Sequence, residues 1–239
     1  MNEFVASIKE NNRRFNEAID ATCTSSNSQA LIICNNEICE LELWFDTLTI
    51  RKEVYLYKMA TKDFFSSIVS VCSGQYRQAF FSLRYFLEHY LFGVYLSARE
   101  MELNIWLRGK RDIYWSEVTD PDKGIFSNNM SLAFFPELAE YNPQFQILSK
   151  KLYREISEFV HGNPEKSNLI PSSYQFDQVL FENWIEKAQN IVYVVKYATA
   201  LRYMTEDTHS DVLKFNELLA DGFKEFDPIE RLISERSSR

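Results

Sequence analysis

Residues 75–101 read QYRQAFFSLRYFLEHYLFGVYLSAREM, and this stretch decides the fold. Its aromatic and aliphatic side chains occur nearly all round a helix, not on one face alone. They are Phe80, Phe81, Tyr85, Phe86, Leu87, Tyr90, Leu91 and Phe92. A helix that is apolar on every side is one that other helices bury. The stretch therefore predicts a central helix with further helices packed around it.

The same stretch carries four polar residues that need an explanation: Arg77, Arg84, Glu88 and His89. Arg84 and Glu88 are one helical turn apart, which predicts an ion pair on the helix surface. Charged groups on so apolar a helix require partners, a cavity or an interface to face. All four residues are therefore candidates to line one cleft.

The rest of the chain also favours helices. With 239 residues it can bury a substantial core, and its 6 Gly and 6 Pro supply too few turns for a protein of many strands. No internal repeat or change in composition divides it. We therefore predict one all-α domain over residues 1–239, with long central helices, an irregular excursion at about 107–127 and a helical tail at about 207–239. The expected helices are 2–20, 29–45, 52–72, 75–101, 131–141, 142–161 (capped by Asn142, with Pro143 in its first turn), 176–205 and 211–219.

Charge and cysteine content restrict the classes of function. The formal net charge of −8 argues against a protein that coats nucleic acid by bulk electrostatics, although it leaves room for a local basic site. We see no basic-then-apolar leader and no apolar run approaching about 18 residues, so we expect a soluble, cytoplasmic protein with no membrane partner. The four cysteines form no CxxC pair. We interpret them as reduced thiols in the core.

A second stretch carries the chemistry. Residues 154–161 read REISEFVH and are followed by Gly-Asn-Pro. Arg154 and His161 are nearly two helical turns apart, so their side chains leave the same face of a helix. Gly162 suits the position after a helix end, and Pro164 cannot continue the helix. A permanent cation and a general acid or base therefore share one face near a helix end, which suits chemistry on a phosphodiester.

The string LYREISEFVHG at residues 152–162 resembles the signature of the HEPN superfamily, which is an arginine, then four to six intervening residues, then a histidine near the end of a helix. The resemblance implies a HEPN-like helical bundle that is dimeric and acts as a metal-independent endoribonuclease without a cofactor. It also implies a setting in toxin–antitoxin or anti-phage defence, with an antitoxin or sensor protein as a further partner. Glu155 departs from the pattern, because family members often have Asn, Asp or His after the arginine.

The implied reaction explains why the site would be composite. Cleavage beside a ribose 2′-OH needs a base for that hydroxyl, an acid for the leaving oxygen and positive charge for the transition state. One His161 cannot easily be base and acid at once. Two copies across a two-fold axis can supply both, with two Arg154 side chains holding the phosphate. The catalytic candidates are Arg154 and His161, with Tyr153, Glu155, Arg84 and Glu88 as modulators.

Two alternatives stay open. The first is a HEPN-like interaction or dimerisation module that does not cut RNA, which Glu155 and the acidic charge balance favour. The second is a di-iron carboxylate bundle, because Glu158-Phe-Val-His161 and Glu206-Asp-Thr-His209 are both Glu-x-x-His, with Glu88 as a further ligand. Both of these motifs fall at expected helix ends, whereas a di-iron site lies within a bundle. Neither a P-loop nor a GxGxxG pattern occurs, so a nucleotide-phosphate fold has no support.

Overall fold

The regular structure of the chain is helical, as predicted. The computed structural model describes residues 2–45, 48, 50–161, 163–205, 223 and 226–237, and within these it contains no strand. None of the helices in these ranges is both long and apolar enough to cross a membrane. In chain order the elements are α1 (Asn2–Thr22), α2 (Ser25–Phe45), α3 (Val54–Cys72), α4 (Tyr76–Ser97), α5 (Glu100–Leu107), α6 (Trp115–Val118), α7 (Asn128–Phe134), the 3₁₀ helix η2 (Pro136–Tyr141), α8 (Asn142–Val160), α9 (Pro164–Ser167), α10 (Gln178–Tyr203) and α12 (Asp227–Ser237).

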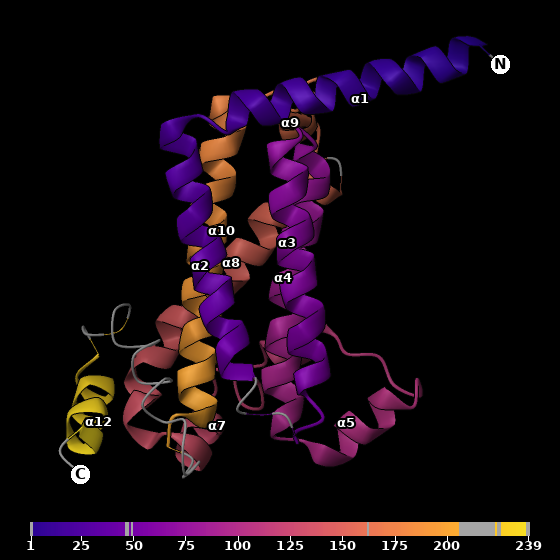
Figure 1. The fold of residues 1–239 in the computed structure, drawn as a ribbon. Coiled ribbons are helices and arrows are strands. Elements are labelled where there is room, and N and C mark those ends of the chain that lie inside the picture. The colour runs from indigo at the N-terminus through magenta and orange to yellow at the C-terminus, as the bar shows by residue number, and fades with distance from the viewer. Residues whose placement is uncertain are drawn as a thin grey trace.

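Helix α4 occupies the centre of the bundle, where the sequence places it. It packs along α3 over the length of both helices and also packs against α8 and α10, while Arg77 and Tyr85 stay exposed (Figure 1). Helices α3 and α4 approach closely at Gly93. A Cβ atom at this position would lie 2.5 Å from Cε1 of Tyr57, well inside van der Waals contact. Glycine is therefore what allows the Tyr57 ring to lie against the backbone of α4.

A buried serine connects three of the central helices. The Ser67 hydroxyl on α3 donates to the carbonyl of Ala79 on α4 at 2.6 Å, and it accepts from Nε1 of Trp184 on α10 at 2.8 Å. Both Ser67 and Trp184 are fully buried. The indole N–H requires an acceptor inside the core, and the hydroxyl can serve because it donates and accepts at the same time. One side chain thus fixes the relative position of α3, α4 and α10.

Asn142 does not have the predicted role of a helix cap. It is the first residue of α8 and is almost completely buried. Its amide nitrogen donates to the Ser131 hydroxyl at 2.6 Å, and its amide oxygen accepts from Tyr197 at 2.9 Å. The Asn142 side chain links three elements, because α7 and α10 both pack against the beginning of α8. Sequence spacing alone cannot distinguish such a buried amide from a cap.

Several helix boundaries differ from the prediction. Helix α2 begins at Ser25, not near residue 29, and a helix expected to reach residue 101 ends at Ser97 before α5 starts. The expected helix 131–141 is divided into α7 and η2 at Pro136. A proline inside a helix has no backbone N–H to donate, and its ring clashes with the carbonyl four residues earlier. The excursion 107–127 contains the short helix α6. The helix expected at 211–219 lies outside the described residues.

The cysteines are not all in the core. Cys34 is buried, and burial together with the nearby Glu37 raises the pKa of its thiol to about 12. Cys72 is half-buried, but Cys23 and Cys39 are exposed. The interpretation of all four as core thiols is therefore wrong for these last two.

Helix α1 lies across one end of the bundle and extends past it (Figure 1). Its second half is packed: Ala18 is buried, and the Phe15 ring is 4.4 Å from that of Tyr174, centroid to centroid. Its first half leaves the bundle, so that Phe4 is 71% and Ile8 45% exposed. The same apolar stripe is thus covered in one half of the helix and open in the other.

We expect Ser67→Ala to lower the free energy of unfolding by about 1–3 kcal/mol, because it leaves the buried Trp184 N–H without an acceptor. Urea unfolding followed by tryptophan fluorescence measures the change. The matched control is Ser66→Ala, since Ser66 is exposed and bonds within its own helix to the carbonyl of Lys62. Equal stability of the two variants would contradict the role given to Ser67.

Candidate active site

Three consecutive residues of α8 have three different surroundings. Successive side chains on a helix are separated by about 100°, and Leu152 and Ile156 turn towards the core. This orientation leaves Tyr153 beside α4, Arg154 in solvent and Glu155 beside α10. The sequence predicts one functional string here, but the structure distributes its members over three sides of the helix.

Arg84 is the centre of the polar cluster between α4 and α8. Its Nε donates to Oε1 of Glu88 at 3.1 Å, which confirms the predicted pair one turn apart. One terminal nitrogen donates to the Tyr153 hydroxyl at 2.5 Å, and the other lies 2.9 Å from Nε2 of His161. The Arg84 side chain is only 18% exposed. Arg84 therefore joins the end of α8 to the middle of α4.

The contact with Arg84 defines the form of His161. A guanidinium group donates hydrogen bonds and cannot accept them, so Nε2 of the imidazole must be the acceptor. This arrangement corresponds to the tautomer with its proton on Nδ1. His161 directly follows the last residue of α8, its backbone N–H bonds to the carbonyl of Ser157 at 2.9 Å, and its side chain is exposed. The contact therefore presents Nε2 as an acceptor at an exposed helix end.

Tyr153 and Trp115 form the wall of this cluster. The Tyr153 hydroxyl bonds to Glu88 as well as to Arg84, and burial, followed by the negative charge of Glu88, raises its pKa above the usual range. Its ring stacks on Trp115 of α6, with centroids 4.3 Å apart and planes 9° from parallel. Sequence reasoning missed Trp115, because the only signal was an aromatic residue within an irregular stretch.

Arg154 and His161 are both exposed, but they are not in contact. Seven residues of helix separate them by about 10 Å along the axis. Arg154 has no hydrogen-bond or ion-pair partner among the residues that the structure describes. Arg154 therefore adds an exposed positive charge to the face of α8 that also carries His161.

Glu155 is part of a separate ion pair. One of its carboxylate oxygens lies 2.7 Å from Nζ of Lys187 on α10, and Lys187 also contacts Glu186 at 3.0 Å. Burial alone would lower the pKa of Lys187, but the bonds to both glutamates outweigh burial and raise it. Glu155 therefore holds α8 against α10. Its charge is directed away from Arg154 and His161.

The other polar residues of α4 lie outside the cluster. His89 contacts Asp63 on α3, with Nδ1 and Oδ2 2.6 Å apart, and its ring stacks on Tyr85. Arg77 is exposed in the first turn of α4, nearly two turns before Arg84. Of the four residues expected to line one cleft, the structure therefore brings Arg84 and Glu88 to the site.

The di-iron alternative finds no ligand group in the described part of the chain. Within those residues, no three His, Cys, Asp or Glu side chains are placed to hold a metal ion together. Glu158 is on α8 next to His161, as the motif requires, but Glu206 and His209 lie outside the described residues.

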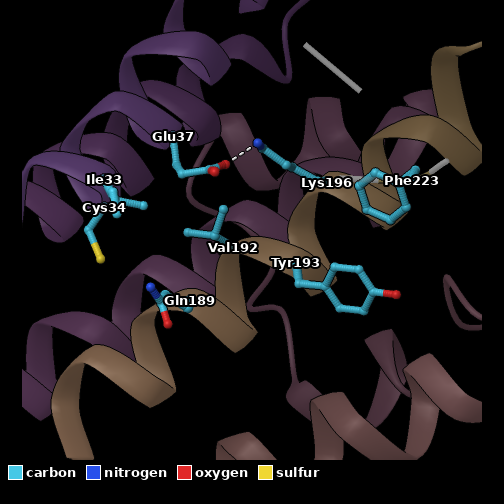
Figure 2. A pocket seen from close by; sticks show the side chains of 8 residues that line it. All are labelled: Ile33, Cys34, Glu37, Gln189, Val192, Tyr193, Lys196 and Phe223. Carbon is cyan, nitrogen blue, oxygen red and sulfur yellow. Dashed lines mark ion pairs between the residues drawn. The ribbon is translucent and has the colours of Figure 1, made fainter. Parts of the chain in front are cut away.

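A cavity of about 240 Å³ lies away from this cluster, between α2 and α10 (Figure 2). Its lining is mostly apolar. Lys196 is its buried charged group, and it forms ion pairs with Glu37 and, at 3.3 Å, with Glu40. None of the residues predicted for the site lines this cavity. Because its lysine is already paired, the cavity offers less for catalysis than the cluster around Arg84.

Comparison of the chain with protein-family models, with curated proteins and with solved structures finds no match. The functional argument therefore depends on the cluster itself and on the resemblance of residues 152–162.

We expect Glu155→Gln to reduce the free energy of unfolding by about 1–2 kcal/mol, because it leaves the mostly buried Lys187 with a single, exposed carboxylate. Glu158→Gln on the same helix is the control, and it should change stability by no more than about 0.5 kcal/mol. Chemical denaturation of the two variants gives both values. A loss of RNA cleavage by Glu155→Gln without a loss of stability would mean that Glu155 belongs to the active site instead.

Proposed function

We propose that the chain is a metal-independent endoribonuclease whose general base and acid is His161. The observation that supports this most directly is the contact between Arg84 and His161, because it places Nε2 of an exposed imidazole beside a guanidinium group that can bind a phosphate. The resemblance of the α8 string to the HEPN signature points to the same chemistry. A homodimer would complete the site, since base and acid must act in the same turnover.

Arg84 gives the proposed reaction an order of events. In the free protein it occupies Nε2 of His161, the nitrogen that must accept the proton of the 2′-OH. A phosphate oxygen is a stronger partner for a guanidinium group than a neutral imidazole is, because the bond is assisted by charge. Binding of a phosphodiester would therefore draw Arg84 from His161 to the substrate and release Nε2 to act as base.

The second copy of His161 would act as the acid. In its protonated form this imidazole would give its proton to the leaving oxygen, while the phosphate lies between the histidine and Arg84. Arg154, exposed and unpaired among the described residues, would add positive charge for the phosphorane-like transition state. The products would be a 2′,3′-cyclic phosphate and a 5′-OH.

The test is incubation with single-stranded RNA in excess EDTA. We expect the wild type to produce fragments that end in 2′,3′-cyclic phosphates. We expect His161→Ala to cut more slowly than the wild type by a factor of roughly 100 or more. Arg84→Ala and Arg154→Ala should also be slower. The control is His89→Ala, which removes the other histidine among the described residues and should cut like the wild type. Intact RNA with the wild type, or equal cutting by His161→Ala, would exclude the proposal.

One observation favours the alternative of a non-catalytic interaction module. Arg84, Glu88 and Tyr153 bond to one another in a closed ring, and such a ring would also serve as a purely structural connection between α4 and α8. The variants distinguish the two functions. If the ring is only structural, Arg84→Ala lowers stability in step with Glu88→Ala, and no variant changes RNA cleavage because there is none.

A further inference from the structure

Two cysteines from distant parts of the sequence meet at the end of the bundle that α1 crosses. Cys23 directly follows α1, and Cys72 is the last residue of α3. The Thr22 hydroxyl joins the helix ends, because it donates to the carbonyl of Ala18 at 2.7 Å and also lies 3.2 Å from the carbonyl of Cys72. The two thiols approach each other at this corner. The other cysteines, Cys34 and Cys39, lie on α2 and do not join this contact.

The two thiols differ in their access to solvent. Cys23 is exposed, so a small oxidant in solution can reach its sulfur. Cys72 is half-buried, and burial followed by the nearby Cys23 raises its pKa to about 11. Cys72 therefore remains a thiol while Cys23 is the sulfur that meets the oxidant first.

We propose that Cys23 and Cys72 are a redox modification site that forms a reversible intramolecular disulfide. The contact between the thiols and the fixed helix ends carry this inference, because a disulfide needs its sulfur atoms adjacent without movement of the backbone. The site is independent of the proposed ribonuclease activity, and it requires neither a metal nor a partner chain.

Hydrogen peroxide is an oxidant that balances the reaction. The Cys23 sulfur attacks one peroxide oxygen, the O–O bond breaks, and Cys23 becomes a sulfenic acid as one water leaves. The Cys72 sulfur then attacks the Cys23 sulfur, and the S–O bond breaks. The departing hydroxide takes the Cys72 proton and leaves as a second water. Two thiols and one peroxide thus give one disulfide and two waters, and a dithiol reductant reverses the change.

The bond would fix helix α1 relative to α3. The second half of α1 packs through Phe15 on Tyr174, within the segment that follows His161 and α9 (Figure 1). A covalent link at the end of α1 would therefore stiffen the end of the bundle where α8 finishes. In the reduced protein, the thiol contact and the Thr22 bond hold the same corner without a covalent link.

The experiment treats the full-length reduced protein with hydrogen peroxide and measures its intact mass before and after unfolding and alkylation, followed by peptide mapping. We expect the oxidised protein to be about 2 Da lighter than the reduced protein before alkylation. Peptide mapping should find a peptide that links Cys23 to Cys72, with alkylation confined to Cys34 and Cys39. Oxidation should also raise the melting temperature by about 5 °C, because the bond closes a long loop. A dithiol should reverse both changes.

Three variants decide whether the link is the proposed one. Cys23→Ser and Cys72→Ser should each abolish the mass loss and the rise in melting temperature. Cys39→Ser removes the other exposed thiol and should behave like the wild type. A link that involves Cys39, a link between two chains, or conversion of Cys23 to a sulfinic acid without any link would each overturn the proposal.

Discussion

The bundle depends on a helix that is buried over most of its surface. Because α3, α8 and α10 pack against the apolar sides of α4, a polar group that faces them must find a partner within that layer. Ser67 and Trp184 show how the layer is fixed, by a hydroxyl that bonds to a backbone carbonyl and an indole at once. Arg84 and Glu88 mark the place where polar groups lie between two of these helices. Their side chains extend from α4 towards α8, and the candidate site forms at this seam between α4 and α8.

The residues that meet at this seam differ from those of the sequence string 152–162 that predicted the site. Tyr153, Arg154 and Glu155 are neighbours in sequence, yet the rotation of α8 directs them to α4, to solvent and to α10. Glu155, the residue that departs from the HEPN pattern, is neutralised by Lys187 and has no contact with His161. The group that does contact His161 is an arginine from another helix, 77 positions earlier in the chain.

The sequence was sufficient for the features that depend on local periodicity. The apolar content of α4, the apolar residues along α10 and the start and stop signals around α8 identified them as long helices, and the spacing of Arg84 and Glu88 identified their ion pair. It was not sufficient where tertiary contacts decide. The bond from Arg84 to His161 requires α8 to lie against α4 in one register, and the stacking of Trp115 on Tyr153 requires the excursion to fold back. Asn142 precedes a proline as a helix cap often does, but its side chain instead bonds to residues of α7 and α10, which pack against the beginning of α8.

Gly93 has an evolutionary consequence. With the ring of Tyr57 where a Cβ would lie, neither position can change freely while the other stays as it is. A larger residue at position 93 becomes acceptable only beside a smaller one at position 57, so the two positions should vary together in any lineage that keeps this helix pair. The packing of the two helices thus couples two positions that lie 36 residues apart in the sequence.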